Sequence, residues 1–471
     1  MRKTKIVCTI GPVSESMEMM EKLVKAGMDV IRLNFSHGDY KEHGDRIKTI
    51  RAINEKLGTH VGVLADTKGP EIRIGTMENG GVEFKTGDLV TVTVDEVIGT
   101  KEKFQIVCPE LFEDVDVDTK LLVDDGKITM TVVERVGNDL VCRIENSGII
   151  KTKKGINVPN IALSMPFISE KDDADIRFAA KNDCDFLAAS FVRRASDIQE
   201  IRKILAEEGN DHMEIIAKIE NQEGFDNLEE ILEASDGVMV ARGDLGVEVS
   251  LQLVPMYQKE MIAMANRMGK PVVTATHMLE SMTGNPRPTR AEASDVANAV
   301  MDGSDAIMLS GESAAGLYPV ESVTTMATIA DATESILDYQ KYVLRNSEFT
   351  SRTINEAIGI AVSESCLTLD NVSCVMAFTE TGGTPKRLCR FRPKAPLIAA
   401  TNSEHTARKM SLYWGVYPVL DNDIIDADLY DETASRIAAK LDFPKGSKMI
   451  ITAGWRAGHG NTNTMFITEV E

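Results

Sequence analysis

The chain has 471 residues, which is long enough for two or three domains. Its content of 43% hydrophobic and 27% charged residues is ordinary for a globular protein. Its formal net charge of −21 disfavours nucleic acid and anionic membranes as partners, because both would repel the surface, although a small anionic ligand could bind where positive charge is concentrated. The seven cysteines stand singly and no apolar run approaches ~20 residues, which argues against a disulfide framework, a structural zinc site and a membrane span, and favours a cytoplasmic protein.

Short apolar runs alternate with helical patterns from the start of the chain, which is typical of strand–helix–strand units with a buried parallel sheet. The first predicted strand begins at Lys5, which leaves no room for a secretory leader. The first helix has Ser14 as a possible cap. The predicted strands cover residues 5–10, 30–35 and 61–65, and the predicted helices cover residues 14–27 and 42–57.

The pattern changes between Glu71 and about Pro166. Alternating, β-branched segments punctuated by Gly, Asn-Asp and Asp-Asp-Gly replace the strand–helix rhythm. Such a stretch predicts a small all-β domain, hairpins included, inserted into an α/β chain. We place this inserted domain at residues 70–166.

The strand–helix rhythm resumes at Pro166 and adds five further strands. They are predicted at residues 186–192, 215–219, 238–241, 271–276 and 306–309, with helices at 170–182, 196–208, 251–268, 289–303 and 319 to about 339. Together with the three earlier strands they make eight, the number that closes a (β/α)₈ TIM barrel. The sequence therefore predicts an α/β barrel formed by residues 1–69 and 167–345.

A fresh alternation of helices and strands follows from about Ser351. Helices are predicted at residues 353–368, 385–390, 405–413 and 428–441, and strands at 374–378, 397–400, 416–419 and 449–452. This order predicts a separate, doubly wound α/β domain over residues 346–471.

Ionisable residues follow the predicted strands at 215–219 and 238–241, at the face where a barrel of this kind places its chemistry. Glu220 and Asp244 would suit an oxygen-liganded divalent cation such as Mg²⁺. Lys218, on the same side of the strand as Glu220, could meet negative charge that develops on a phosphoryl group. A solvated cluster of ion pairs is the alternative interpretation.

Two further strand ends carry oxygen-bearing side chains that would suit a large monovalent cation. These side chains, next to Arg32, are Asn34, Ser36, Asp66 and Thr67. Judged by composition alone, these four side chains are more simply explained as ordinary helix caps and hydrogen-bonding groups of turns. Taken by itself, Thr276 indicates only a residue that favours a β-strand. His37 and His277 could titrate near neutrality, but a lone histidine is more often a hydrogen-bonded structural residue.

The Gly-rich turn from Gly243 to Gly246 precedes a predicted helical segment. Free backbone N–H groups in such a turn could hold a carboxylate or a phosphate. Turns of this composition are common, so this pattern alone is weak evidence for an anion site.

Several longer motifs are together specific enough to resemble one known family. They are CTIGP at 8–12, RLNFSHG at 32–38, DTKGPEIR at 66–73, VDDG at 123–126, KIENQEG at 218–224, MVARGDLGVE at 239–248, NPRPTRAEASDVANAV at 285–300, MLSGES at 308–313 and GWRAGHGNTNT at 454–464. These motifs resemble pyruvate kinase of the bacterial, K⁺-dependent type. The resemblance implies transfer of the phosphoryl group of phosphoenolpyruvate to ADP, which gives pyruvate and ATP in the final step of glycolysis. It also implies Mg²⁺ (or Mn²⁺) and K⁺ as cofactors and a cytoplasmic homotetramer.

Matched position by position, the resemblance implies roles for individual residues. Glu220 and Asp244 match the Mg²⁺ ligands, while Asn34, Ser36, Asp66 and Thr67 match the K⁺ site, with Glu71 as the Glu usual in K⁺-dependent members. The matched catalytic residues are Lys218, Arg32 and Thr276, and the substrate-binding residues are Arg32, Gly243, Asp244 and Thr276. The nucleotide side is matched by Pro12, Asn34, His37, Arg73 and Lys154, of which Lys154 lies on the insert, expected to act as a lid.

The C-terminal domain resembles the part of the family that binds a sugar-phosphate effector. The matched effector residues are Thr379, Thr381, Gly382, Thr384, Lys440 and Trp455. Gly383 and Pro385 depart from the usual pattern of the phosphate loop, which leaves the identity of the effector open. The extra C-terminal domain of some bacterial members is not expected after Glu471.

Two departures lie in the barrel. His277 stands where the family usually has Gln, and Ala315 stands where many members have Lys. The first could alter the protonation step, and the second puts one nucleotide phosphate contact in doubt. Two alternative functions are a metal-dependent aldolase or lyase that forms a pyruvate enolate, and a catalytically silent effector-binding regulator. The presence of Lys218, Glu220 and Asp244 disfavours the regulator.

Overall fold

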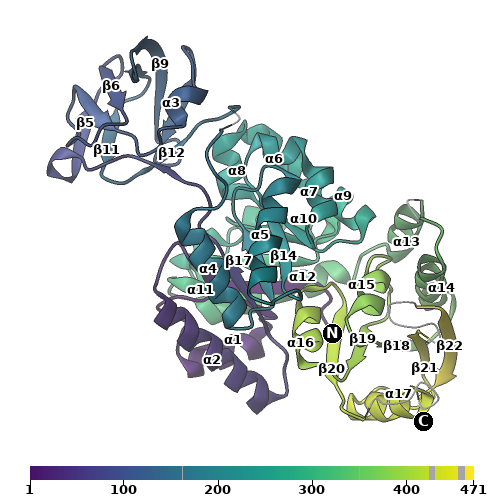
Figure 1. Ribbon diagram of the computed structural model, residues 1–471. Coiled ribbons are helices and arrows are strands. Elements are labelled where there is room, and N and C mark those ends of the chain that lie inside the picture. The colour runs from purple at the N-terminus through teal and green to yellow at the C-terminus, as the bar shows by residue number, and fades with distance from the viewer. Residues whose placement is uncertain (162, 349–350, 424–429, 455–461, 471) are drawn as a thin grey trace.

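The barrel predicted from the sequence is present in the computed structural model (Figure 1), which describes residues 1–161, 163–348, 351–423, 430–454 and 462–470. Eight parallel strands close into a barrel in the order β1-β17-β16-β15-β14-β13-β3-β2. They are β1 (Lys5–Thr9), β2 (Val30–Asn34), β3 (Gly62–Asp66), β13 (Phe186–Ala189), β14 (Glu214–Ile219), β15 (Gly237–Ala241), β16 (Val272–Ala275) and β17 (Ala306–Leu309). The prediction of a (β/α)₈ barrel is therefore confirmed.

Helices surround the barrel, and the longer ones each bury an apolar stripe against its strands. They are α1 (Met17–Ala26), α2 (Tyr40–Leu57), α4 (Glu170–Lys181), α5 (Ala195–Glu207), α6 (Gln222–Asp226), α7 (Leu228–Ala234), α8 (Arg242–Glu248), α9 (Val254–Met268), α10 (Arg290–Asp302), α11 (Gly311–Ala314) and α12 (Pro319–Glu334). Short 3₁₀ turns at Leu251–Leu253 and Glu280–Thr283 complete this layer. The barrel interior is filled by buried side chains such as Val7, Ile216 and Met239, so it is a packed core and no channel.

Three sequence predictions about helix limits and turns are wrong. Ser16, not Ser14, caps α1, because Ser14 accepts the Gly11 N–H at 3.1 Å inside the preceding turn. The helix predicted to run from Pro319 to about Tyr339 ends at Glu334, and a new helix begins at Tyr339 after its own cap, Asp338. The segment from Gly243 to Gly246 precedes the helix predicted at 251–268, but it is not a turn, because it forms part of the short helix α8.

The segment after β3 forms sheets of its own, as the alternating pattern predicts. A seven-stranded sheet has the order β4-β12-β8-β9-β10-β6-β7, and a two-stranded sheet pairs β11 with β5. The strands are β4 (Ile72–Arg73), β5 (Gly81–Phe84), β6 (Leu89–Thr93), β7 (Lys103–Gln105), β8 (Lys120–Val123), β9 (Ile128–Val136), β10 (Asp139–Ile144), β11 (Gly148–Lys151) and β12 (Gly155–Asn157), with a 3₁₀ turn at Glu78–Gly80 and helix α3 (Leu111–Asp114). Figure 1 shows this β-rich insert standing out from the barrel, around a separate hydrophobic core.

The C-terminal part is an α/β unit with a five-stranded sheet in the order β20-β19-β18-β21-β22. Its strands are β18 (Val372–Phe378), β19 (Leu397–Thr401), β20 (Val416–Leu420), β21 (Lys448–Ala453) and β22 (Thr464–Glu469), and its helices are α13 (Tyr339–Ser347), α14 (Ile354–Thr368), α15 (Gly383–Cys389), α16 (Glu404–Lys409) and α17 (Tyr430–Lys440), with a 3₁₀ turn at Met410–Leu412. Strand β22 was not predicted, because it is a half-exposed edge strand that pairs antiparallel with β21.

The C-terminal unit packs against the end of the barrel opposite the predicted site (Figure 1). Leu412 joins the buried residues of the barrel interior. Tyr413 donates a hydrogen bond of 2.7 Å to Glu214, at the start of β14, and Arg392 pairs with Asp305, just before β17, at 3.0 Å. No helix in the described ranges is long and apolar enough to cross a membrane.

Candidate active site

A buried network of charged side chains lies at the carboxyl ends of β2, β3 and β14. The ammonium of Lys218 is 3.1 Å from Glu220 Oε1 and 3.0 Å from Asp66 Oδ1. The other oxygen of Asp66 accepts from Arg32 Nε at 2.5 Å, and Arg32 Nη1 also donates to Thr9. Because the strands are parallel and in register, Asn34 of β2 aligns with Asp66 of β3 and their ends meet at one edge. The structure thus brings Arg32, Asp66, Lys218 and Glu220 together, as expected from the sequence.

Ser190, which the sequence analysis missed, belongs to the same network. Lys218 Nζ donates to Ser190 Oγ at 2.6 Å, and that hydroxyl donates to the backbone oxygen of Thr67 at 2.7 Å. The side chain is buried directly after β13. Its position at a strand end was the available clue, since the neighbouring strand ends carry Asp66 and Lys218 at the same face.

The residue after Ser190 places a backbone donor at the site. Phe191 has a φ of 55°, and its N–H donates to Glu220 Oε2 at 2.6 Å. A positive φ is unfavourable for a bulky residue and is maintained only where surrounding contacts hold it. Glu220 is therefore oriented by Phe191 on one oxygen and by Lys218 on the other.

Burial and mutual charge set the protonation states of these groups. Burial lowers the pKa of Lys218, but Asp66 and Glu220 outweigh this effect, so its pKa is raised and the ammonium stays charged. Burial raises the pKa of Glu220 to about 8, against the attraction of Lys218 and with added repulsion from Asp244 and Asp66. Burial also raises the pKa of Asp66, but Arg32 and Lys218 bring it below its usual value.

The donor set at the ends of β14 and β15 fits a hard divalent cation. Three carboxylates, Asp66, Glu220 and Asp244, face two cationic groups, Arg32 and Lys218, so a further positive charge would lower the mutual repulsion. The Asp244 side chain makes no hydrogen bond or ion pair with the residues that the structure describes, which leaves its carboxylate available as a ligand.

Thr276 and Gly243 are joined directly at the ends of β16 and β15. The Thr276 hydroxyl accepts the Gly243 N–H at 2.7 Å and donates to the backbone oxygen of Ala275 at 2.6 Å. Thr276 has a φ of 66° and His277 a φ of 53°. Positive φ is an outlier for a β-branched residue, and Arg242, which donates to the Thr276 carbonyl at 2.7 Å, helps to hold this conformation.

The residues predicted for a monovalent cation lie on adjoining strand ends. Asn34 Oδ1 accepts the Ser36 N–H at 3.0 Å, and the Thr67 hydroxyl donates to Ala188 O at 3.4 Å. Glu71 pairs with Lys68 at 2.9 Å and with Arg73 at 2.5 Å. The structure therefore places Asn34, Ser36, Asp66 and Thr67 in one neighbourhood, and it engages Glu71 with two cations.

Comparison with known proteins matches this chain to the same family over nearly its whole length. The family model described as "Pyruvate kinase, barrel domain" matches residues 1–323, and that described as "Pyruvate kinase, alpha/beta domain" matches residues 356–468. Proteins named pyruvate kinase from Geobacillus stearothermophilus and Staphylococcus haemolyticus are each 50% identical, over 98% and 99% of this chain and 80% of their own lengths. One from Staphylococcus aureus is 51% identical over 99% of this chain and 80% of its own length.

The chain belongs to the pyruvate kinase family. It is therefore a phosphotransferase, and its reaction moves the phosphoryl group of phosphoenolpyruvate to ADP, giving pyruvate and ATP in the final step of glycolysis.

The residues matched to the nucleotide side of pyruvate kinase are only partly brought together. Arg73 donates to the Lys153 carbonyl at 2.8 Å, and Lys154 pairs with Asp124 at 2.7 Å. Arg73 and Lys154 therefore both make their contacts within the insert. His37 lies 3.4 Å from the Asn34 amide, at the barrel. A cavity of about 440 Å³ lies between the insert and the barrel, lined by insert residues such as Ile72 and Asn157 and by barrel residues such as Asn221, Asp244 and Glu248.

Four of the effector residues matched to pyruvate kinase, Thr379, Thr381, Gly382 and Thr384, lie in the loop before α15 or at its start. Thr379 accepts the Gly382 N–H at 2.9 Å, and the hydroxyls of Thr384 and Thr462 are 2.8 Å apart. Gly382 has a φ of 88°, and Gly383 and Pro385 belong to the first turn of α15, where a proline is tolerated. Thr381 lies within this loop, Lys440 is the last residue of α17, and Trp455 lies outside the described residues.

Proposed function

We propose that Lys218 is the cation that balances charge building on the phosphoryl group during transfer. The observation that carries the proposal is its buried ammonium, held by Asp66 at 3.0 Å and by Glu220 at 3.1 Å. Phosphoryl transfer depends on positioning and charge neutralisation more than on a nucleophile. A charge fixed in advance needs little reorganisation as the transition state forms, so it is more effective than a mobile lysine.

Glu220 and Asp244 are proposed as the residues that hold Mg²⁺ or Mn²⁺. Support comes from the excess of carboxylates around them and from the free carboxylate of Asp244. When bound, the divalent ion would neutralise charge on substrate oxygens. Phe191 and Lys218 fix the orientation of Glu220, so this ligand is pre-positioned.

Arg32 is proposed to bind the phosphate of phosphoenolpyruvate, and its ion pair with Asp66 orients the guanidinium. Gly243, Asp244 and Thr276 are proposed to receive the substrate carboxylate. The Gly243 N–H donates to Thr276 in this structure, so a bound carboxylate would take over that donor. The Thr276 hydroxyl would then be free to lie near the path by which the enolate is protonated.

Asn34, Ser36, Asp66 and Thr67 are proposed to hold K⁺. Their oxygen atoms lie on neighbouring ends of β2 and β3, next to Arg32, the proposed phosphate contact. A monovalent cation there would add positive charge beside the transferred group without displacing the divalent site.

The nucleotide side is proposed to use Pro12, Asn34, His37, Arg73 and Lys154. Residues 70–166 form the proposed lid, which would close over the cavity that the insert and the barrel share. Closure would carry Lys154 toward the barrel and exclude water, which matters because hydrolysis competes with transfer.

Regulation is proposed to reside in residues 346–471, where a sugar phosphate would bind the loop from Thr379 to Thr384, with Lys440 and Trp455 as further proposed contacts. We further propose a cytoplasmic homotetramer whose catalytic barrels comprise residues 1–69 and 167–345. The free, buried cysteines are compatible with a reducing compartment.

The test is coupled pyruvate production from phosphoenolpyruvate and ADP with Mg²⁺, with K⁺ or Na⁺, for the intact chain and Lys218→Met. Lys22→Met removes an exposed lysine of α1 and serves as the control. We expect K⁺-stimulated turnover that collapses only in Lys218→Met, while circular dichroism shows both variants folded. Equal turnover without K⁺ would remove the role given to Asn34, Ser36, Asp66 and Thr67. Full activity of Lys218→Met would refute the proposed catalytic cation.

A further inference from the structure

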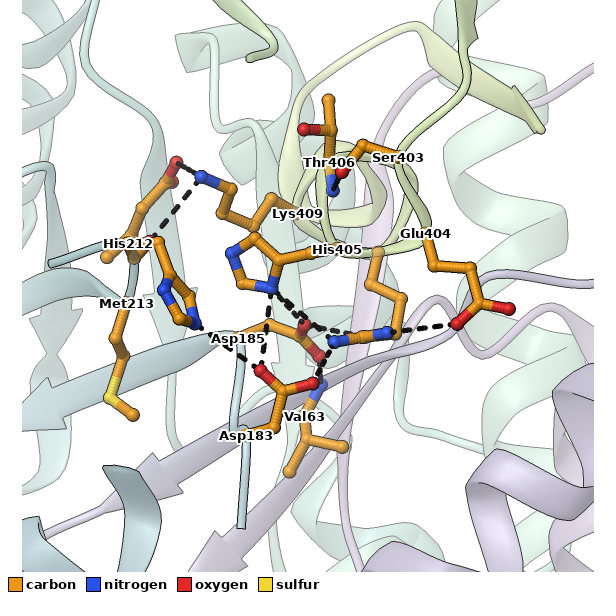
Figure 2. Close-up of polar contacts among 12 residues, drawn as sticks. Val63, Asp183, Asp185, His212, Met213, Ser403, Glu404, His405, Thr406 and Lys409 are labelled. Carbon is orange, nitrogen blue, oxygen red and sulfur yellow. Dashed lines mark hydrogen bonds and ion pairs between the residues drawn. The ribbon is translucent and has the colours of Figure 1, made fainter. Parts of the chain in front are cut away.

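A cluster of two histidines and an aspartate lies at the junction of the barrel and the C-terminal unit, at the end of the barrel opposite the active site. Asp183 precedes β13 and His212 precedes β14, whereas His405 belongs to α16 (Figure 2). One potential ligand atom from each residue lies within 4.8 Å of the others. The cluster has no part in the reaction proposed above.

The separations within the cluster are those expected between ligands of one metal ion. His212 Nε2 is 3.4 Å and His405 Nδ1 is 3.7 Å from the same atom, Asp183 Oδ1. These distances are long for hydrogen bonds. Zinc–ligand bonds of about 2.0–2.2 Å at tetrahedral angles would place ligand atoms about 3.3–3.6 Å apart, close to both observed values.

The two imidazoles make only long polar contacts: His212 Nε2 lies 3.4 Å from Asp183 Oδ1, and His405 Nδ1 lies 3.4 Å from Arg408 Nη2. Their centroids are 4.0 Å apart in an edge-to-face arrangement, and His405 Nε2 is buried without a partner among the described residues. Polar atoms in such a position are usually paired, so this unpartnered ring nitrogen needs an explanation.

Surrounding residues orient the aspartate toward the rings. Arg408 Nη2 is 2.5 Å from Asp183 Oδ2, which turns Oδ1 to the two histidines. Arg408 Nε also pairs with Asp185 at 2.8 Å, and Asp185 in turn accepts the Val63 N–H at 2.8 Å, so the supporting arginine is itself fixed (Figure 2).

We propose that Asp183, His212 and His405 bind a divalent transition-metal ion of the zinc class. Two imidazole nitrogens and one carboxylate oxygen select such an ion over Mg²⁺, which prefers oxygen ligands. Asp183 is 56% exposed and both rings are partly exposed, so an ion can enter from solvent and a water can complete the coordination. Because two ligands come from the barrel and one from α16, the ion would tie the C-terminal unit to the barrel.

The test is calorimetric titration of the full chain with Zn²⁺ in saturating Mg²⁺, which occupies the carboxylate site of the barrel. His212→Ala and His405→Ala remove one ligand each, and Asp183→Asn keeps the shape of the third. His60→Gln is the control, because His60 lies near the same end of the barrel, in a separate cavity beside Ser411. We expect one Zn²⁺ per chain in the intact protein and in His60→Gln. The dissociation constant should rise by more than about tenfold in each ligand variant, since loss of a mere outer-shell partner already costs 10–100-fold.

Co²⁺ gives a second, spectroscopic readout under the same conditions. An intense visible absorption typical of a tetrahedral site should appear in the intact chain and be lost in His212→Ala and His405→Ala. Unchanged Zn²⁺ binding in the ligand variants, or weak octahedral absorption alone, would overturn the proposal. His405→Gln replaces His405→Ala if the latter does not fold. Binding is measured without turnover, so failure of the kinase assay would not affect the result.

Discussion

Asn157 of β12 donates a hydrogen bond of 2.7 Å to Glu248 of α8, so the insert is held to the barrel at the edge of the cavity they share. Burial raises the pKa of Glu248 to about 7, against the effect of the Asn157 bond and with added repulsion from Asp244. The carboxyl group at this contact is therefore protonated over a range where an exposed glutamate is ionised.

Glu248→Gln should change how thermal stability depends on pH. Below about pH 4.5, the ordinary pKa of a glutamate, Glu248 is protonated in folded and unfolded chains and has no effect on stability. As the pH rises from about 4.5 to about 7, the unfolded chain releases this proton first, so the folded state loses stability, by at most roughly 3 kcal/mol. Calorimetric melting of the metal-free protein should show that the melting temperature falls less between pH 4.5 and pH 8 for Glu248→Gln than for the intact chain. Glu200→Gln, on an exposed face of α5, should show the full drop.

Ser190→Ala should lower kcat with little change in KM, because Ser190 positions Lys218 and is not itself a proposed substrate contact. A hydrogen bond to a charged group contributes about 1.5–3 kcal/mol, which corresponds to a loss of roughly 10- to 100-fold. Steady-state kinetics with varied phosphoenolpyruvate measure both constants. Ser196→Ala, at an exposed position of α5, is the control. An unchanged kcat would show that Asp66 and Glu220 alone are sufficient to position the ammonium.

The barrel and much of the site could be predicted because both follow from short-range patterns. A buried parallel strand is a short apolar run, and residues at its carboxyl end meet those of its neighbours through the register alone. That is why Arg32, Asp66, Lys218 and Glu220 come together as expected.

The features that were missed depend mainly on long-range contacts, although Ser190 also had the local clue of its position at a strand end. Ser190 joins the site through a long-range hydrogen bond, and the positive φ of Thr276 is held by Arg242 from another strand end. His212 and His405 are far apart in the chain and meet only because α16 packs on the barrel, so a search for closely spaced ligands could not find them.

The error at the first helix cap leads to a local prediction. Ser16→Ala should remove the acceptor of the Met19 N–H and destabilise the start of α1 by about 1 kcal/mol. Amide hydrogen exchange should therefore become faster at Met19. Ser14→Ala removes the acceptor of the Gly11 N–H instead, so its exchange should change at Gly11 and not at Met19. Faster exchange at Met19 in Ser14→Ala would return the capping role to Ser14.

The buried ion pair between Arg392 and Asp305 should determine how firmly the C-terminal unit docks. The two side chains are only 3% and 5% exposed, and Arg392 also donates to Asn266 at 2.8 Å. Arg392→Met would leave the Asp305 carboxylate buried and unpaired, which costs roughly 3–5 kcal/mol. Urea unfolding followed by the fluorescence of Trp414, whose ring lies under the Arg392 guanidinium, reports on this interface.

Two further variants separate the pair from a general loss of charge. Asp305→Asn added to Arg392→Met should recover part of the stability, because the unpaired charge is then gone. Arg436→Met removes a half-exposed partner of Asp421 and should cost about 1 kcal/mol or less, since solvent screens exposed pairs. If Arg392→Met lowers the free energy of unfolding no more than Arg436→Met does, the buried pair gives no net stability to docking. The contacts of Leu412 and Tyr413 with the barrel would then hold the C-terminal unit in place.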